Sequence, residues 1–359
     1  MEYVLAAASA TLGTPLVAPV PLAGGGRTTV LRCRTGDGGT VVVKAYRPEP
    51  DALSAFTAEA AALAFGVAGP RLLAVDPGTP LIVMEDLGDA PSVADLLLGG
   101  DAEASHAALL DWAGGLGRLC AGTVGREPEL AALRERYDRG HPAWHRDRHV
   151  ERCARLPGLL ADLGSAPPAG LDEDLAEVLA VADPAHYPVF SPGDTCPDNN
   201  LLTAGGLRVL DFELASYHCV FLDAAYPVMP FATCWCVFRL PAPVADQITT
   251  AFRTEVVRAY PALADDTVWW PGVRRAVAAW TINLTTLLLP GIAGADRPAH
   301  ADRRPVATWR QILRYRWRFL ADLLAAADEL PAVAAAMRSL LAATGGWGVG
   351  PLPFYPPWR

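Results

Sequence analysis

Five side chains of this 359-residue chain have the types and spacing that phosphate chemistry requires. Lys44 is the single lysine among 30 Lys and Arg residues, so one ammonium stands in a chain that otherwise uses guanidinium groups. Asp194 and Asn199 follow the spacing D-x-x-x-x-N, and Asp211 comes shortly after them. Glu59 lies between these groups and the lysine.

Phosphoryl transfer from ATP requires a cation at the phosphates, a group that orients this cation, oxygen ligands for Mg²⁺ and a carboxylate that orients the attacking hydroxyl. Lysine is a compact, strongly hydrated point charge, unlike arginine. Mg²⁺ prefers hard oxygen ligands and usually binds one or two protein groups plus the phosphates, which suits Asn199 and Asp211. Asp194 is then left for the substrate hydroxyl. Each group alone is more often a turn former, but the order and spacing of all five favour phosphoryl transfer.

The segments that must position Lys44 have an extended pattern. Segments 16–22, 28–34 and 40–46 are rich in apolar and β-branched residues, and Asp37-Gly38-Gly39 is typical of a hairpin turn. Pro19 and Pro21 place the first segment at the edge of a sheet. The first two segments flank Gly24, Gly25 and Gly26, whose backbone N–H groups could approach phosphate oxygens. A glycine-rich hairpin is more often only a turn.

The pattern becomes helical from Pro50 onward. Apolar residues recur at helical spacing, and Glu59 falls within the same helix. These residues are Ala52, Phe56, Ala60 and Leu63. Two apolar runs at 71–75 and 81–84 follow, and the second ends in Glu85-Asp86-Leu87-Gly88. We expect a boundary there, which divides the chain into an N-terminal nucleotide-binding lobe at 1–88 and a catalytic and substrate-binding lobe at 89–359.

The second lobe is predicted to be mainly helical. Residues 92–185 have helical patterns, with expected breaks at 114–117, 126–128 and 166–170. A short strand at 187–190 precedes the loop that carries Asp194, and a hairpin at 201–210 leads to Asp211. Further helices are expected within 241–343, followed by an apolar tail at 345–359 that packs on the body.

Five stretches resemble the aminoglycoside phosphotransferase family, which has a protein-kinase-like fold and phosphorylates small-molecule hydroxyls. They are VVVKAY, FTAEAAAL, LIVMEDLGD, GDTCPDNNLL and VLDFELA, and the resemblance covers about residues 20–225. It implies an α+β bilobal fold, with a small antiparallel-sheet N-lobe bearing one helix and a larger, mainly helical C-lobe.

The resemblance also implies a role for each matching residue. Lys44 would contact the ATP phosphates and pair with Glu59, and Glu85, Asp86 and Leu87 would present hinge backbone to adenine. Asp194 would be the catalytic base, Asn199 and Asp211 would bind Mg²⁺, and Asp223 would brace the catalytic loop. One departure stands out, because Pro192 occupies the position two residues before Asp194 where the family usually has histidine.

The acceptor is left open by the sequence. A small-molecule hydroxyl, as in an antibiotic or a biosynthetic intermediate, is the preferred interpretation. A kinase of peptide Ser or Thr residues and a catalytically silent kinase-fold binding protein are the alternatives. Acidic clusters at 172–174 and 265–266 would suit a polycation, whereas Arg310, Arg314 and Arg318 share one helical face and would suit an acidic or peptide substrate if that face lined the cleft. If it faces water or pairs with acids, it says nothing about the substrate.

Composition narrows the partners. A net charge of −9 argues against nucleic acid and anionic membranes, and 52% apolar residues provide ample core. The N-terminus lacks the charged region of a signal peptide, and the most apolar later stretch is too short to span a bilayer, so a cytoplasmic protein is expected. The seven cysteines are therefore predicted to be reduced core residues. Cys234-Trp235-Cys236 and the histidines 141, 145 and 149 are not expected to bind zinc, because the first lacks a second pair and Pro142 interrupts the second.

Overall fold

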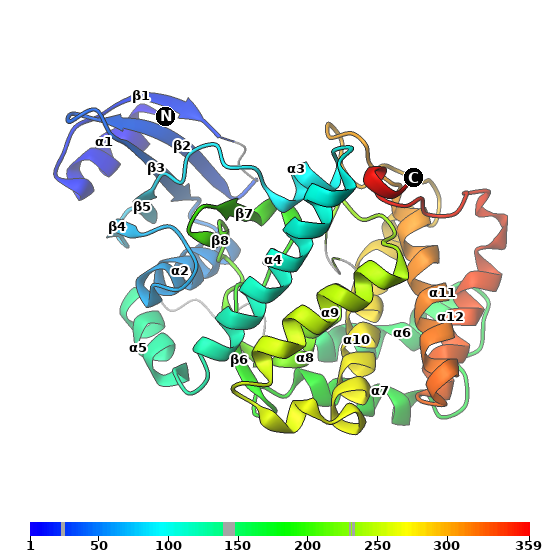
Figure 1. Ribbon diagram of the computed structural model, residues 1–359. Coiled ribbons are helices and arrows are strands. Elements are labelled where there is room, and N and C mark those ends of the chain that lie inside the picture. Colours follow the sequence, from blue (N-terminus) through cyan, green and yellow to red (C-terminus); the bar gives the residue numbers. More distant parts are fainter. Residues whose placement is uncertain (23–25, 139–147, 230, 232–233) are drawn as a thin grey trace.

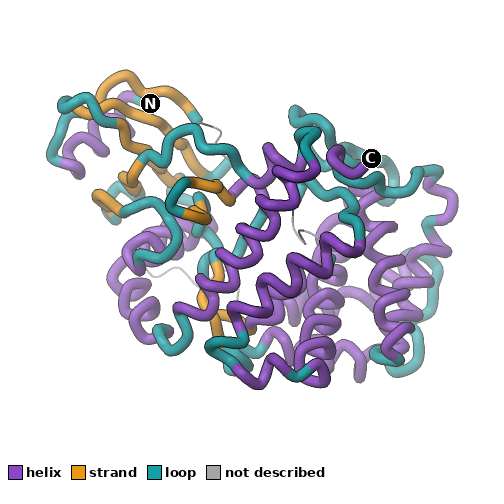
Figure 2. The backbone as a smooth tube through the Cα atoms, in the orientation of Figure 1, coloured by secondary structure: helices purple, strands orange, loops and turns teal. Residues whose placement is uncertain are grey.

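The computed structural model describes residues 1–22, 26–138, 148–229, 231 and 234–359. Figure 1 shows a small sheet-bearing lobe beside a larger lobe built mainly of helices. The same division is clear in Figure 2, where most strands gather at one end of the molecule and short strand segments lie among the helices. An α+β bilobal arrangement is therefore present, as the sequence predicts.

The small lobe is a five-stranded antiparallel sheet in the order β1-β2-β3-β5-β4. The edge position of β1 confirms the expectation drawn from its two prolines. Besides the expected helix after Pro50, a second helix, α1, precedes the sheet. The elements are α1 (Glu2–Leu12), β1 (Leu16–Pro21), β2 (Thr28–Thr35), β3 (Thr40–Tyr46), α2 (Pro50–Phe65), β4 (Leu72–Asp76) and β5 (Leu81–Glu85).

Alternation along β3 decides what each face of the sheet carries. Val41 and Val43 belong to a buried apolar cluster shared with α1. Lys44 and Tyr46 point to the opposite face, because successive side chains of a strand point to opposite sides. Tyr46 packs there against Phe56 of α2, with ring centroids 5.5 Å apart. The buried face of α2 therefore lies where it meets the side chain of Lys44.

The larger lobe begins with α3, whose first turn is closed by a capping box between Ser92 and Asp95. Its helices are α3 (Val93–Leu97), α4 (Ala102–Gly122), α5 (Glu127–Tyr137), α6 (Arg148–Asp162), α7 (Leu171–Leu179), α8 (Val220–Val228), α9 (Ala242–Val256), α10 (Asp266–Ile292), α11 (Trp309–Ala327) and α12 (Pro331–Ala343). Two small antiparallel pairs carry the loops of the site, β6 (Pro188–Ser191) with β9 (Ser216–Cys219) and β7 (Asn200–Thr203) with β8 (Gly206–Val209).

One expected helix break is wrong. α4 runs without interruption through 114–117. A Cβ at Gly115 would lie 2.7 Å from Leu207, and a Cβ at Gly117 would lie 2.7 Å from the carbonyl oxygen of Phe252. These glycines allow α4 to pack closely on β8 and α9, which outweighs their low helix propensity.

The C-terminal tail packs on the body, as predicted. Tyr355 is fully buried, and its hydroxyl donates a hydrogen bond to the carbonyl oxygen of Cys236 at 2.8 Å. Within the described part of the chain, no helix combines the length and apolar character needed to cross a bilayer.

Candidate active site

The Lys44 side chain lies in a buried cluster of opposite charges between the two lobes. Its Nζ atom is 2.5 Å from Oε2 of Glu59 and 3.1 Å from Oδ1 of Asp211. The Tyr46 hydroxyl donates a second hydrogen bond to the same Glu59 oxygen. Helix α2 therefore delivers the carboxylate that orients the ammonium, and Asp211 joins this pair from the second lobe.

Burial and charge act against each other in this cluster. Burial raises the pKa of Glu59 to about 7, despite its contact with the Lys44 ammonium. Burial by itself would lower the pKa of Lys44, but the carboxylates of Glu59 and Asp211 outweigh it and raise that pKa above its ordinary value. Lys44 is therefore held as an ammonium, which is the form that attracts phosphate oxygens.

Asp194 and Asn199 lie on one tight loop after β6. The backbone N–H of Cys196 donates to Oδ1 of Asp194 at 3.2 Å, and the Asn199 amide reaches the Asp194 carbonyl oxygen at 3.5 Å. Leu210 N–H donates to the carbonyl oxygen of Asn199 at 2.9 Å, so the residue before Asp211 is tied to this loop. The two oxygen-bearing side chains predicted to hold Mg²⁺ are thus carried by backbone segments that are hydrogen-bonded to each other.

The segment after Asp211 contributes a second carboxylate. Burial and the neighbouring charge of Asp211 raise the pKa of Glu213. Glu213 also accepts a hydrogen bond from Arg27 at 2.5 Å, and Arg27 follows the glycine cluster of the small lobe. An ion pair therefore connects the glycine-rich turn to the strand end that carries Asp211.

The carboxylates of Glu85 and Asp86 form hydrogen bonds and ion pairs with neighbouring segments. Oε2 of Glu85 accepts hydrogen bonds from the backbone N–H of Arg71 and from Arg208, at 3.0 and 3.2 Å. Asp86 pairs with Arg32 of β2 at 2.9 Å. Burial opposes ionisation of Asp86, but the hydrogen bond from Gly88 and the charge of Arg32 lower its pKa below the ordinary value. These side chains hold the connection in place, and the role of the hinge backbone at Glu85, Asp86 and Leu87 stays a prediction.

The predicted phosphate loop is described only in part. Gly24 and Gly25 lie outside the described residues. Gly26 is exposed in a turn directly before β2, and a Cβ built on it would meet nothing within 4 Å. The role of Gly26 at the phosphates stays a prediction.

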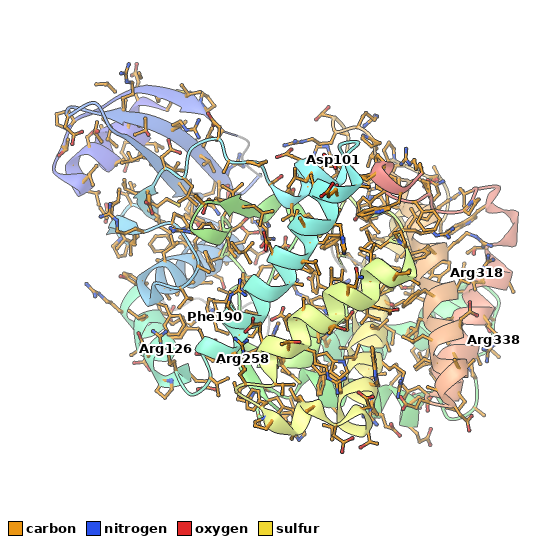
Figure 3. All side chains as sticks on the ribbon, viewed as in Figure 1. Asp101, Arg126, Phe190, Arg258, Arg318 and Arg338 are labelled. Atoms are coloured by element: carbon orange, nitrogen blue, oxygen red, sulfur yellow. A yellow bond between two sulfur atoms is a disulfide. The ribbon has the colours of Figure 1, made fainter. Side chains whose placement is uncertain are left out.

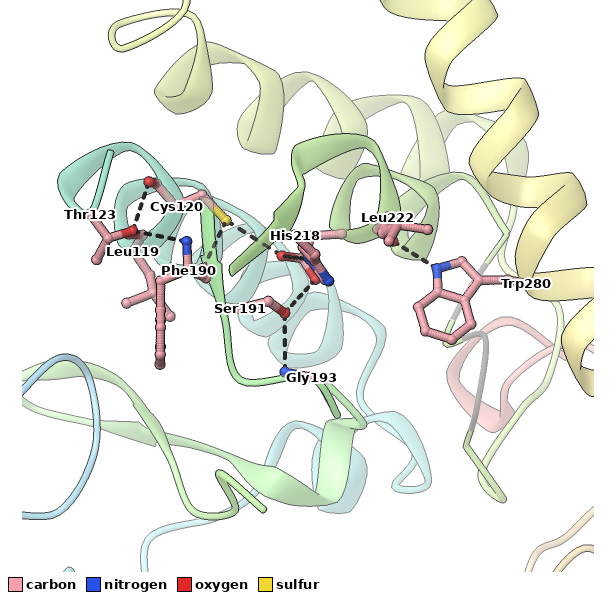
Figure 4. A network of polar contacts seen from close by, with 10 residues as sticks. Leu119, Cys120, Thr123, Phe190, Ser191, Gly193, His218, Leu222 and Trp280 are labelled. Atoms are coloured by element: carbon pink, nitrogen blue, oxygen red, sulfur yellow. Dashed lines mark hydrogen bonds and ion pairs between the residues drawn. The ribbon is translucent and has the colours of Figure 1, made fainter. Parts of the chain in front are cut away.

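Asp223 lies below the catalytic loop in the first turn of α8 and is 1% exposed. Oδ1 accepts a hydrogen bond from Ser191 at 3.0 Å, and Oδ2 lies 3.0 Å from Nε2 of His218 (Figure 4). Ser191 Oγ accepts the backbone N–H of Gly193 at 3.0 Å. Asp223 is therefore connected to the loop that carries Asp194.

The cysteines of the catalytic loop correct one prediction. Cys196 and Cys234 form a disulfide with a Cα–Cα distance of 5.4 Å, whereas all seven cysteines were expected to be reduced. The other five are free and buried. The expectation failed because 38 residues separate the pair in sequence, and only the packing of the α8–α9 connection against the loop brings them together.

The arginine face of α11 does not line the cleft. Arg310 donates to the carbonyl oxygens of Ile292 and Ala293 at the end of α10, and Arg314 donates to Leu341 at the end of α12. Cations are stabilising at helix C-termini, where carbonyl groups lack partners. Arg318 is exposed on the outer side of α11 (Figure 3). This face therefore gives no information about the acceptor.

The acidic clusters have equally structural roles. Asp174 accepts the backbone N–H groups of Ala332 and Val333 at the start of α12, at 2.7 and 2.9 Å. Asp265 caps α10 through the N–H of Thr267. One acid of each cluster is therefore engaged in capping a helix. The histidines 141 and 145 lie outside the described residues, and His149 packs on Trp280 with ring centroids 5.1 Å apart.

A pocket of about 340 Å³ lies beside the catalytic loop, between α3 and the segment before α11. Trp235 Nε1 donates to Oδ2 of Asp198 at 2.7 Å, and the guanidinium of Arg303 lies over the Trp235 ring at 5.8 Å. Arg304 and Asp95 also line this pocket. Sequence reasoning missed the pocket, because its residues come from four distant segments.

One partner was visible in the sequence and was missed. Tyr46 lies two residues after Lys44, so the period of a strand places both on one face. The pairing of Glu59 with Lys44 was implied by the resemblance, and the place of Glu59 on the apolar face of α2, three residues after Phe56, also indicates a buried partner for its charge. His218 and Ser191 had no local signal, because they meet Asp223 only in the folded chain.

A small antiparallel sheet with a buried Lys–Glu pair, above a helical lobe that carries the D-x-x-x-x-N loop, defines a kinase-like phosphotransferase. The chain belongs to the phosphotransferase enzyme family, whose model matches residues 20–265. No curated protein matches the chain.

Solved structures with the same fold cover most of the chain. Macrolide 2'-phosphotransferase MphH from Brachybacterium faecium is 20% identical with a TM-score of 0.51, over 81% of this chain and 93% of that chain. Choline kinase from Cryptosporidium parvum Iowa II is 11% identical with a TM-score of 0.51, over 91% and 90%. The ternary complex of APH(2")-IIa with streptomycin and ATP is 13% identical with a TM-score of 0.52, over 82% and 94%. At these identities the likeness shows the fold.

Proposed function

We propose that this phosphotransferase moves the γ-phosphate of ATP to a hydroxyl group of a small molecule, such as an antibiotic or a natural-product intermediate. The observation that carries the proposal is the contact of Lys44 with both Glu59 and Asp211, across the two lobes. A lysine ammonium oriented by a helix carboxylate, beside a second carboxylate from the other lobe, is the arrangement that phosphoryl transfer from a nucleotide uses. Residues 1–88 would then be the nucleotide-binding lobe and residues 89–359 the catalytic and substrate-binding lobe.

The donor set fits magnesium and ATP. Asn199 and Asp211 supply hard oxygen atoms, and their segments are joined by the hydrogen bond from Leu210 to Asn199. Bound with ATP, Mg²⁺ would neutralise phosphate charge. Lys44 would hold the phosphates, and Gly26 with the neighbouring glycines would cover them. The backbone of Glu85, Asp86 and Leu87 would face the base.

Asp194 would orient the acceptor. In the proposed step the acceptor oxygen bonds to the γ-phosphorus, the bond from that phosphorus to the β–γ bridging oxygen breaks, and the hydroxyl proton passes to the Asp194 carboxylate. The hydrogen bond from Cys196 N–H to Oδ1 fixes one oxygen of this carboxylate. Asp223 would hold the loop through Ser191.

The pocket lined by Trp235 and Asp198 is the proposed acceptor site. Its volume of about 340 Å³ is near the lower end for small-molecule sites, and it suits a compact molecule better than an extended peptide chain. Its charged lining comprises Asp95, Asp198, Arg303 and Arg304. Because the two signs are present in equal number, the lining does not favour a polycation. The kinase of peptide Ser or Thr residues, the second enzyme candidate, rested on an arginine face that would line the cleft, but Arg310 and Arg314 donate to helix ends, so no observation favours it.

The test combines nucleotide binding with a screen of hydroxyl-bearing compounds for added phosphate by mass spectrometry. Asp194→Ala should abolish transfer and keep Mg·ATP binding, whereas Asp183→Ala, which removes an exposed carboxylate in a surface turn, should leave both unchanged. Transfer at the wild-type rate in Asp194→Ala would refute the assignment. Mg·ATP binding by the wild type without transfer to any compound or to water would support the silent binding protein instead. The protein is also proposed to be cytoplasmic, which fractionation of its host cells would test.

A further inference from the structure

His218 is placed to act on the catalytic loop although it is 24 residues away from Asp194 in sequence. It lies on β9, opposite Val189 of β6, and β6 leads directly into the loop. Its Nε2 atom is 3.0 Å from Oδ2 of Asp223 (Figure 4). An ionised carboxylate only accepts hydrogen bonds, so Nε2 carries the proton in this contact.

Asp223 is a buried carboxylate, and its contact with His218 supplies part of the hydrogen bonding that it requires. Its side chain is 2% exposed, and a buried carboxylate is costly unless it is hydrogen-bonded and offset by positive charge. Ser191 donates to Oδ1 at 3.0 Å, and the thiol of Cys120 lies 3.7 Å from Oδ2. Both of these donors are neutral. Among the partners found within the described residues, His218 is the ring N–H donor to Oδ2, at a shorter distance than the thiol of Cys120.

The chain of contacts continues from Asp223 to the residue before Asp194. Ser191 Oγ donates to Asp223 and accepts the N–H of Gly193 at 3.0 Å. Pro192 between them has no N–H, so Gly193 supplies the first backbone donor after Ser191. Gly193 has φ +83°, and a Cβ there would lie 2.2 Å from the carbonyl oxygen of Leu214. The loop is therefore pressed against the segment that follows Asp211, and its placement depends on the Ser191 hydroxyl.

We propose that His218 is a positioning residue, which sets the place of the Asp194 carboxylate through Asp223, Ser191 and Gly193. This proposal rests on the proposed function of Asp194. Removing the imidazole leaves Asp223 without its N–H donor, and the carboxylate then draws on the Ser191 hydroxyl and on water. The hydrogen bond from Gly193 to Ser191 loosens, and Asp194 samples positions from which it does not reach the acceptor hydroxyl.

The test compares three variants with the wild type. His218→Phe keeps a ring and removes the donor, His218→Gln restores an N–H donor near the position of Nε2, and Ser191→Ala breaks the same chain of contacts at its next step. His186→Ala is the matched control, because His186 is a surface residue whose nearest carboxylate is Asp183 at 3.8 Å. Thermal unfolding of each variant separates local effects from loss of the fold.

Hydrogen exchange of the peptide that spans 188–200 gives a reading that needs no acceptor. We expect about tenfold faster exchange in His218→Phe and Ser191→Ala, because a hydrogen bond to a charged group contributes about 1.5 kcal/mol or more. His218→Gln and His186→Ala should stay within about twofold of the wild type on the same scale. Wild-type exchange in His218→Phe, or equal exchange in the Phe and Gln variants, would overturn the proposal.

Turnover gives the second reading. Mg·ATP hydrolysis, and transfer to any compound found in the acceptor screen, should show a lower kcat in His218→Phe with an unchanged KM for ATP, since Lys44 and the hinge lie outside this chain of contacts. His218→Gln should recover kcat. A raised KM for ATP with unchanged kcat would contradict a positioning role. Failure of the proposed function would instead appear as full transfer in Asp194→Ala, whereas the exchange experiment does not depend on turnover.

Discussion

The disulfide between Cys196 and Cys234 should stabilise the fold by an amount that follows from the length of the loop it closes. The two cysteines are 38 residues apart in sequence. In the chain-entropy model, closing a loop of that length removes unfolded-state entropy that corresponds to about 4 kcal/mol at 25 °C. Reduction should therefore lower the free energy of unfolding by up to about 4 kcal/mol, because the native contacts around the loop remain while the unfolded chain gains freedom.

The assay is urea denaturation of the wild type and of Cys196→Ser/Cys234→Ser, each with and without dithiothreitol. The reductant should destabilise the wild type and leave the double variant unchanged, and the reduced wild type should resemble the variant. Thiol titration of the denatured protein is the independent count. It should give five thiols before reduction, which correspond to the five free cysteines, and all seven afterwards.

Two results would refute this reasoning. Seven thiols in the unreduced, denatured protein would show that the bond does not form. An equal effect of dithiothreitol on the wild type and on the double variant would assign the stability change to something other than this bond. Cys196 lies two residues after Asp194, so the same samples also show by hydrogen exchange whether the bond restrains the catalytic loop.

Three further predictions concern the Lys44 cluster and the loop. Removing one partner of the buried pair, as in Lys44→Met or Glu59→Leu, should lower the free energy of unfolding by about 3–5 kcal/mol. The double variant should lose less than the sum of the two single losses, which urea denaturation measures. Additive losses would mean that the two side chains are not coupled. The pKa of Glu59 is raised from 4.5 to about 7, so its contribution to stability is present below pH 4.5 and lost as the pH rises through 7. Relative to Glu59→Gln, the wild type should thus lose up to about 3 kcal/mol between these pH values, and parallel pH profiles would contradict this. Gly193→Ala should lower the melting temperature more than Gly206→Ala. Both glycines have positive φ, but only at Gly193 would an added Cβ meet a backbone atom, the Leu214 oxygen at 2.2 Å. Equal losses of melting temperature would contradict this clash.

Periodicity explains why much of the small lobe was predictable. The strand at 40–46 matches β3 residue for residue, because a short run rich in β-branched residues directly after a turn specifies a strand locally. The helix that begins at Pro50 was found for the same reason, since proline at a helix start and apolar residues on one face are local signals. The predicted break in helix α4 was wrong. Glycine lowers local helix propensity, but the close packing of α4 on α9 and β8 outweighs this cost and is not visible in the local sequence.

The features that sequence reasoning missed depend on contacts that form only in the folded chain. The D-x-x-x-x-N loop lies within a few residues, so its spacing was visible. The disulfide joins residues 38 apart and the capping contact of Arg310 joins residues 18 apart, whereas His218 lies only five residues before Asp223, across the connection from β9 to α8, where no regular spacing marks the contact. No local pattern encodes such contacts, because they depend on how helices stack.

The sequence by itself determined the order and spacing of the residues proposed for phosphoryl transfer. Lys44, Glu59, Asp194, Asn199 and Asp211 occur in an order and at spacings that turns, strands and helices place locally. Tertiary structure alone decided that Asp211 joins the pair of Lys44 and Glu59, that Cys196 is bonded to Cys234, and that a pocket lies beside Trp235. The physical reason is that local backbone preferences act over a few residues, whereas burial, charge pairing and pocket shape arise only when distant segments pack together.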